Sequence, residues 1–377
     1  MAIEPFLNPR HGPPGVVVLP AGGYRRARAE IVSWPGYAPT PLRDLPAVAA
    51  AASVAVVRLK DESARFALGS FKALGGAYAV AGQLASQLSR HGVAASASGA
   101  DLAGGRFREA TAGLTVTCAT DGNHGRSVAW GAQRFGCRCV VFVHEGVSQA
   151  RADAIAAFGA DIRRVAGTYD DSVRAAAQVA AAEGWVVVSD TSWPGYTEIP
   201  RAVMQGYRLM PDEAADQWEG PPPTHAFVQG GVGGVAAAVS VQLRARFDPA
   251  PRLIVVEPDR AACLLASAHA GRLAVAGGPL DTIMAGLACG EPSLLAWQEL
   301  ERAAFAFMAI PDAAAVGAMR TLAGLGIVSG ESGAAGLAGF LQAAADPDPL
   351  GLTPTSRVLL FSTEGATDPA LYARLIG

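Results

Sequence analysis

Short apolar runs rich in β-branched residues alternate with alanine-rich segments along most of the chain, and this alternation limits the possible folds more than any other feature. Runs that are apolar at almost every position are typical of parallel sheets covered by helices on both faces. The sequence therefore predicts the α/β class, with ligands bound beyond the carboxyl ends of the strands. The runs predict strands at 54–59, 114–118, 139–143, 185–188, 226–228, 253–256 and 358–361.

At 377 residues the chain is too long for one ordinary domain, so we expect two compact units, each with its own core. Two stretches have the composition of connections. The first, 89–113, is rich in serine, alanine and glycine. The second, 212–224, contains three consecutive prolines and is expected to mark a crossing between domains.

Charge and composition exclude several classes of partner. A net charge of -3 provides no basic field for nucleic acid or an anionic membrane surface, and no apolar stretch approaches the roughly 20 residues that span a bilayer. The first residues show no secretion signal, so a cytoplasmic location is expected. The five cysteines fit neither a disulfide framework nor a zinc site, and no metal is expected. Cys263 and Cys289 could meet across a loop, although free thiols are the simpler expectation. The expected partner is a small molecule.

Lysine is unusually scarce. The 30 basic residues include only two lysines, Lys60 and Lys72, and the rest are arginines. Arginine serves wherever a permanent charge suffices, whereas an amine that must lose its proton and attack a carbonyl has to be a lysine. The two lysines are therefore candidates for covalent chemistry.

Lys72 lies in the segment Ser70-Phe71-Lys72-Ala73-Leu74-Gly75-Gly76, ahead of a predicted helix that continues through 78–88. Phe71 and Leu74 are expected to pack while Lys72 faces a cleft. Desolvation by such neighbours lowers a lysine pKa from about 10.4 and makes the amine able to form an imine with an aldehyde. An isolated lysine would more often lie on the surface, but the glycine pair and the scarcity of lysine favour the imine.

A glycine-rich loop, 229–236, follows one predicted strand and opens an alanine-rich helix. Backbone N–H groups and the helix dipole could hold a phosphate there. Gly231, Gly233 and Ala236 also satisfy a dinucleotide fingerprint, with Glu257 closing the next strand where a ribose-binding acid would lie. A tight strand-to-helix turn without any ligand is the third possibility.

A second loop, Asp121-Gly122-Asn123-His124-Gly125, also follows a strand. Its glycines would let the backbone approach a flat ligand, and the Asn123 amide could contact a phenolic oxygen. A cap for the next helix is the alternative, and His124 taken alone is more often a packed or capping residue. Polar and glycine residues follow the other predicted strands too, and all are expected at one rim: 60–62, 119–125, 189–190, 229–231, 257–258 and 362–365.

Lys72 in SFKALGG, the ATDGNHG and GGVGG loops and the late SGESGA and FSTEG segments together resemble the fold-type II pyridoxal-phosphate enzymes, the family that includes the tryptophan synthase β-subunit. Within that family the chain is most similar to the diaminopropionate ammonia-lyases. The likeness runs from about Trp34 to the C-terminus. It rests on the segments KDESARF, TDGNHGRSVAW, DTSWPGYTEIP, VMQGY, MAGLACGEPS and STEGATDP.

The resemblance implies two α/β domains with mostly parallel sheets, usually in a homodimer: a large cofactor-binding domain at 1–72 and 201–377, and a small domain at 73–200 that closes over the active site. It implies that Lys72 forms a Schiff base with the cofactor and that Asp121 and Asp190 are catalytic acids facing the substrate. The other residues that it implies are Phe71, Asn123, Gly230, Gly231, Val232, Gly233, Gly234 and Ser362 for the cofactor, and Ser70 and Thr191 for the substrate. The segment departs from the resemblance at Gly69-Ser70, where relatives often carry other residues.

The resemblance further implies the α,β-elimination of 2,3-diaminopropionate to pyruvate and ammonia. Lys72 and Asp121 on opposite faces of the substrate would allow both the D and L forms to react, while Asp190 would hold the second amino group. A serine or threonine dehydratase of the same fold is the alternative within this chemistry. An NAD-dependent oxidoreductase using Gly231 and Glu257 is the alternative from another class, and it leaves Lys72 and the Asn123 loop without a role.

Overall fold

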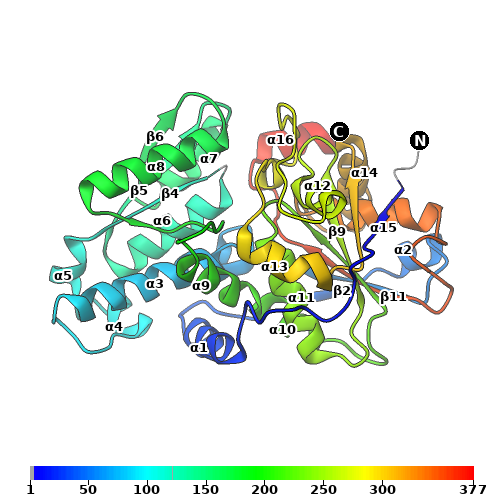
Figure 1. Cartoon of the computed structure of the whole chain (residues 1–377), viewed down its shortest axis with the longest axis horizontal. Coiled ribbons are helices and arrows are strands. Elements are labelled where there is room, and N and C mark those ends of the chain that lie inside the picture. The colour runs from blue at the N-terminus through cyan, green and yellow to red at the C-terminus, as the bar shows by residue number, and fades with distance from the viewer. Residues whose placement is uncertain (1–3, 121) are drawn as a thin grey trace. The chain divides into compact units, whose positions relative to one another are not determined.

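The computed structural model describes residues 4–120 and 122–377 and consists of two compact units (Figure 1). The first unit contains the chain up to Leu19, Pro39–Phe71 and Tyr207–Gly377, and the second contains Pro20–Ala38 and Lys72–Gly206. Within the described residues, no helix combines the length and the apolar character needed to cross a membrane.

The two units differ from the predicted domains at 20–38, Lys72 and 201–206, all of which lie in the second unit, and 212–224 does not mark a crossing. The sequence placed 20–38 in the large domain, but this segment packs in the second unit, where Trp34 contacts Trp130 edge to face at a centroid distance of 6.1 Å. The stretch 212–224 is not a crossing, because it lies wholly inside the first unit. The chain passes between units after Leu19, Ala38, Phe71 and Gly206 instead. Prolines and glycines at 20–23 and 35–41 flank the first two crossings and were the local signal that could have located them.

The first unit is built on a seven-stranded sheet in the order β1-β10-β9-β8-β11-β3-β2, in which only the edge strands β1 and β2 are antiparallel. Its central strands are buried at nearly every position, as a sheet covered on both faces requires. The strands are β1 (Phe6–Leu7), β2 (Leu42–Asp44), β3 (Val56–Asp61), β8 (His225–Gln229), β9 (Arg252–Pro258), β10 (Ala306–Ile310) and β11 (Arg357–Ser362).

The chain runs from β8 to β9 and β10 in one direction across the sheet and then returns to β11 on the other side of β8. Because crossovers between parallel strands are right-handed, this reversal is expected to put α14 and α15 on the opposite face from α11, α12 and α13. Phe340 on α15 packs against Phe227 of β8 in the core. The helices are α2 (Pro46–Ala51), α10 (Leu209–Asp216), α11 (Gly234–Arg246), α12 (Cys263–Ala270), α13 (Leu294–Ala303), α14 (Asp312–Gly324), α15 (Ala335–Ala345) and α16 (Pro369–Ile376), with 3₁₀ turns η1 (Arg65–Ala67) and η2 (Ala285–Leu287).

The second unit has a parallel four-stranded sheet in the order β6-β5-β4-β7. Thr168 and Asp171 form a capping box that begins α8, and glycines with positive φ end α6 and α8. The strands are β4 (Thr115–Ala119), β5 (Arg138–His144), β6 (Asp161–Val165) and β7 (Val186–Val187). The helices are α1 (Ala21–Val32), α3 (Ala73–Arg90), α4 (Gly99–Ala103), α5 (Arg108–Ala112), α6 (Asn123–Phe135), α7 (Gln149–Ala156), α8 (Tyr169–Glu183) and α9 (Glu198–Tyr207), the last of which ends one residue into the first unit.

Each sheet has one point where the order of its strands reverses, and ligands of open α/β sheets bind at such points. In the first unit this point lies between β8 and β11, so it is flanked by Gln229 and Ser362. In the second unit it lies between β4 and β7, beside Thr120 and Asp190. The polar strand ends expected at one rim therefore belong to two separate sheets, and the single rim is corrected to two.

All seven predicted strands form, each within two residues of its expected bounds, and the predicted α/β class is confirmed. The sequence missed β1, β2, β6 and β10. Strand β10 has the sequence AFMAI, in which alanine and methionine suit a helix as well as a strand, and pairing with β9 decides its conformation. The expected connection at 89–113 also contains the short helices α4 and α5.

Candidate active site

Lys72 is the residue immediately before α3, and its side chain ends in an ion pair. The Nζ atom lies 2.6 Å from Oδ2 of Asp190, with the two side chains 19 % and 10 % exposed. The predicted helix after Lys72 is present, and Phe71 and Leu74 are buried as expected. Lys72 is therefore an amine held against the Asp190 carboxylate and still partly open to solvent.

The backbone around Asp190 is fixed by a tyrosine. The Tyr196 hydroxyl donates to the Val187 carbonyl at 2.8 Å and accepts from the Ser189 N–H at 3.1 Å. The Tyr196 ring stacks on Trp193 at a centroid distance of 4.3 Å, and the Thr191 N–H donates to Ser189 Oγ. The segment that follows β7 is thus pinned on both sides of Asp190.

His124 is the third member of this group, and the sequence did not single it out as functional. Its Nε2 lies 2.8 Å from the Val188 carbonyl, which can only accept, so Nε2 carries a proton. Its Nδ1 faces Asp190 Oδ2 at 3.7 Å and has no hydrogen-bond partner among the described residues. The position of His124 directly after a strand, in a glycine-flanked loop, was the signal that could have identified it.

The electrostatics of this group favour an ionised carboxylate. Burial by itself raises the pKa of Asp190, but His124 and the Lys72 ammonium outweigh it and hold that pKa well below its usual range. Burial lowers the pKa of His124, although Asp190 opposes this effect. At neutral pH Asp190 therefore presents a negative charge to any cation that enters the site.

The glycine loop of the first unit offers unused backbone donors. Within residues 4–120 and 122–377, the N–H groups of Gly231, Val232 and Gly233 donate to no acceptor, and helix α11 begins at the next residue. Gly233 has φ of 95°, which favours glycine, and a Cβ on Gly231 would lie 3.1 Å from the Gly286 carbonyl oxygen. A cradle of free N–H groups at a helix N-terminus suits a phosphate.

The strand ends beside this loop are joined by Gln229. Its side-chain amide donates to the Thr363 hydroxyl at 2.6 Å and to the Phe361 and Gly333 carbonyls. Ser362, expected to meet the pyridine nitrogen, is fully buried, and its hydroxyl donates to Ser329 Oγ at 2.8 Å. These bonds fix the end of β11 against β8.

The segment that leads to Lys72 is hydrogen-bonded to the residues that follow β11. The Phe71 N–H donates to the Thr363 carbonyl at 3.1 Å, the Gly365 N–H donates to the Gly69 carbonyl, and Ser70 forms a β-bridge with Glu364. Ser70 is buried, and Phe71 packs on Tyr207 at a centroid distance of 4.6 Å. Lys72 is the next residue in the chain, so its backbone begins where Phe71 is anchored.

Glu257 does not have the environment of a ribose-binding acid. Its two carboxylate oxygens accept the N–H groups of Leu264 and Leu265 at 2.8 and 2.7 Å, at the start of α12, and the side chain is fully buried. Burial raises the pKa of Glu257 to about 8, against the two amide bonds, which lower it. Glu257 caps a helix, and the NAD alternative loses the acid on which it depended.

The candidate site residues divide between the two units. Lys72, Asn123, Asp190 and Thr191 belong to the second unit, where Asn123 is the first residue of α6. The first unit holds Ser70, Phe71, Gly230, Gly231, Val232, Gly233, Gly234 and Ser362. Asp121 lies outside the described residues. Cys263 and Cys289 are buried free thiols.

Comparison with known proteins identifies the class to which this fold and these residues belong. Residues 33–363 match the pyridoxal-phosphate dependent enzyme family. The chain belongs to that family, whose cofactor is pyridoxal phosphate.

Within the family the chain is similar to the diaminopropionate ammonia-lyases. It is 41 % identical to the diaminopropionate ammonia-lyase of Escherichia coli strain K12 over 355 residues, which are 90 % of this chain and 88 % of that protein. The crystal structure of the holo Escherichia coli enzyme has a TM-score of 0.90 at 37 % identity, covering 99 % and 96 % of the two chains. The structure of that enzyme in complex with D-serine also has a TM-score of 0.90, at 36 % identity, and covers 100 % and 98 %.

Proposed function

We propose that the protein eliminates the β-amino group of 2,3-diaminopropionate and releases pyruvate and ammonia. The observation that carries this proposal is the 41 % identity to an enzyme of that activity over 88 % of its length. The pairing of Lys72 with an ionised Asp190 supports it, because the reaction requires an amine that can take a proton and an anion suits the β-ammonium group of the substrate.

The residues present fit the cofactor. The free N–H groups at 231–233 suit its phosphate, and Lys72 is a partly exposed amine that would hold it covalently. By resemblance, Asn123 would contact the ring hydroxyl and Ser362 the pyridine nitrogen. When bound, pyridoxal phosphate withdraws electrons from Cα of the attached substrate and so makes the Cα proton acidic.

The chain supplies the proton transfers. The freed Lys72 amine would take the Cα proton, the electron pair of the C–H bond would form the Cα–Cβ double bond, and the Cβ–N bond would break. An amine leaves readily only when it carries a proton, so the β-amino group must depart as a protonated species. Hydrolysis of the released aminoacrylate gives pyruvate and the second ammonia.

Asp190 would distinguish the diamine from hydroxyl substrates. Its pKa lies well below the usual range, so the carboxylate stays charged and can hold the β-ammonium of diaminopropionate. Serine and threonine carry a neutral hydroxyl at that position and would gain little from an anion. The charge of Asp190 therefore favours a diamine substrate over the serine or threonine of a dehydratase.

Asp121 is proposed as a second base on the opposite face of the substrate, which would allow both enantiomers to react. The Asp121→Asn variant should then lose roughly 100-fold or more in kcat on one enantiomer, and far less on the other. Equal rates with wild type on both enantiomers would remove Asp121 from the mechanism. The homodimer and the cytoplasmic location also stay predictions.

The decisive experiment is an absorbance spectrum of the purified holoenzyme with and without each substrate, together with an assay for keto-acid release. We expect a bound-cofactor band that shifts with diaminopropionate, and faster keto-acid release from it than from serine or threonine. Lys72→Arg is the matched control, because it keeps a cation beside Asp190 but cannot form the imine. Faster turnover of threonine or serine would identify a dehydratase, and a colourless active protein would exclude the cofactor.

A further inference from the structure

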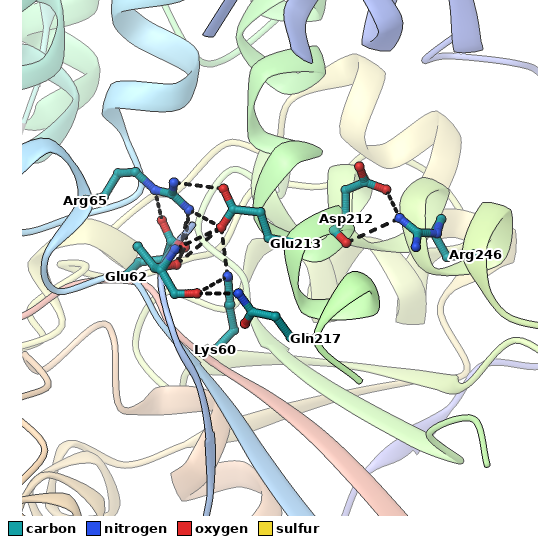
Figure 2. Close-up of polar contacts among 8 residues, drawn as sticks. Lys60, Glu62, Arg65, Asp212, Glu213, Gln217 and Arg246 are labelled. Atoms are coloured by element: carbon teal, nitrogen blue, oxygen red, sulfur yellow. Dashed lines mark hydrogen bonds and ion pairs between the residues drawn. The ribbon is translucent and has the colours of Figure 1, made fainter. Parts of the chain in front are cut away.

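A second charged group lies in the first unit, outside the residues considered so far. We call it the strand-end cluster and define it as Lys60, Glu62, Arg65 and Glu213 (Figure 2). Lys60 and Glu62 stand at the end of β3, Arg65 begins the 3₁₀ turn η1, and Glu213 lies on α10. The four side chains are at most 4 % exposed.

Arg65 is the centre of the strand-end cluster. Its guanidinium donates to both oxygens of Glu62, each at 2.8 Å, and to both oxygens of Glu213, at 2.9 and 2.6 Å. Lys60 Nζ lies 2.7 Å from Glu213 and donates to the Thr40 carbonyl at 2.5 Å. Two cations thus balance two carboxylates, and Arg65 holds both acids through planar, bidentate contacts that a lysine could not reproduce.

A network of this kind adds little net stability, because desolvation of buried charges offsets their attraction. Its presence therefore calls for another explanation. Backbone strain directly after Arg65 provides one. Phe66 and Ala67 have φ of 49° and 57°, a left-handed conformation that L residues rarely adopt and that persists only where the surroundings hold it.

The strained turn leads directly to the catalytic lysine. Beyond Gly69, the chain is tied to Thr363 and Glu364 through Phe71 and Ser70. The strained segment is therefore held at one end by the Arg65 guanidinium and at the other by the residues that follow β11. Lys72 directly follows Phe71, whose N–H donates to the Thr363 carbonyl.

From these contacts we propose that Arg65, clamped by Glu62 and Glu213, is a positioning residue that holds the strained 66–69 segment and so sets where the Lys72 amine stands. The proposal rests on the proposed function for the role of Lys72. The Arg65 guanidinium is directed at Glu62 and Glu213. Its effect passes through the backbone to Phe71 and on to Lys72.

The test compares the holoenzymes of wild type, Arg65→Lys and Arg246→Lys. Arg246 is a matched control, since it also binds two carboxylates, those of Asp212 (Figure 2) and Asp216, and it is the last residue of α11. For Arg65→Lys we expect kcat on diaminopropionate to fall roughly 10- to 100-fold with KM changed less than about threefold, the size expected when a catalytic group is misplaced. Arg246→Lys should stay within about twofold of wild type.

Two further readouts separate positioning from folding and do not depend on the substrate. Hydrogen exchange followed by mass spectrometry should show faster exchange in the peptide that covers 65–72 of Arg65→Lys, with the strands of both sheets still protected. The absorbance band of the bound cofactor should shift its pH midpoint in Arg65→Lys and not in Arg246→Lys.

Three outcomes would overturn the proposal: wild-type kcat and exchange in Arg65→Lys, an equal loss in Arg246→Lys, or loss of exchange protection throughout Arg65→Lys, which would make Arg65 a folding residue. If wild type itself releases no pyruvate from diaminopropionate, the proposed function fails. The exchange and absorbance readouts would then still decide whether Arg65 positions Lys72.

Discussion

The surroundings of Lys60 and Lys72 differ although the two lysines are only twelve residues apart in the chain. Lys60 is fully buried, and a second cation and two carboxylates complete its network. Lys72 is partly exposed, its Nζ atom pairs with Asp190, and it stands beside the switch point of the second sheet.

This difference shows that a rare lysine can be retained for two unrelated reasons. The compact ammonium of Lys60 contacts both the Thr40 carbonyl and Glu213 in a buried space. The guanidinium of an arginine is larger and would not fit there in the same way. At Lys72 an amine is needed because it can lose its proton and join a carbonyl. The scarcity of lysine alone did not distinguish the two roles.

The largest effect is expected when the Lys72 amine is replaced by a guanidinium. Lys72→Arg should lower kcat by at least about 1,000-fold, because the guanidinium keeps the charge and loses the nucleophile. Borohydride reduction of wild-type holoenzyme followed by peptide mass spectrometry should label Lys72 and leave Lys60 unmodified. Labelling of Lys60, or an active Lys72→Arg enzyme, would reverse the roles assigned here.

Removal of the charge at Lys60 should instead affect stability. Lys60→Met leaves Glu213 and Glu62 with one cation, and breaking a buried pair in this way typically costs about 3–5 kcal/mol. Urea unfolding of the apo-protein measures the change. Lys72→Met is the matched comparison and should lower the unfolding free energy by less than Lys60→Met does, since the Lys72 side chain is 19 % exposed and its partner can regain water. Similar losses in both variants would remove the distinction.

Asp190 should matter for catalysis more than for folding. We expect Asp190→Asn to lower kcat roughly 100-fold, because the amide is neutral and cannot hold an ammonium group. The loss should be greater with diaminopropionate than with serine, whose hydroxyl makes no use of the charge. Steady-state kinetics on both substrates provide the comparison, and an equal loss would contradict the specificity role.

The smallest expected effect is the pH dependence of stability due to Asp190. Its pKa in the folded protein is depressed, so its stabilising contribution is present above the unfolded value of about 3.9 and is lost as pH falls through the lower folded value. The difference in urea midpoint between wild type and Asp190→Asn should therefore be constant from about pH 5 to 9 and shrink only below about pH 4. A change near pH 7 would mean that Asp190 titrates there.

Local patterns predicted much of the fold and part of the candidate site. Strands such as 139–143 could be found because a run of buried β-branched residues has no other stable arrangement. The loop at 229–236 could be recognised because several glycines between a strand and a helix are typical of a turn whose backbone N–H groups have no partner in the chain. Strand β10 and the segment 20–38 could not be placed, because their local sequence suits several structures and only packing partners decide between them.

By itself the sequence determined the α/β class, the place of Lys72 ahead of a helix and the glycine loop at 229–236, since each depends on residues that are neighbours in the chain. Only the tertiary structure decided which acid faces that amine, that His124 joins it, and that Lys60 is enclosed by Glu213 from α10. Asp190 lies 118 residues from Lys72, and Glu213 lies 148 residues from Arg65. Contacts over such separations arise from the order of strands in a sheet, and no local pattern records that order.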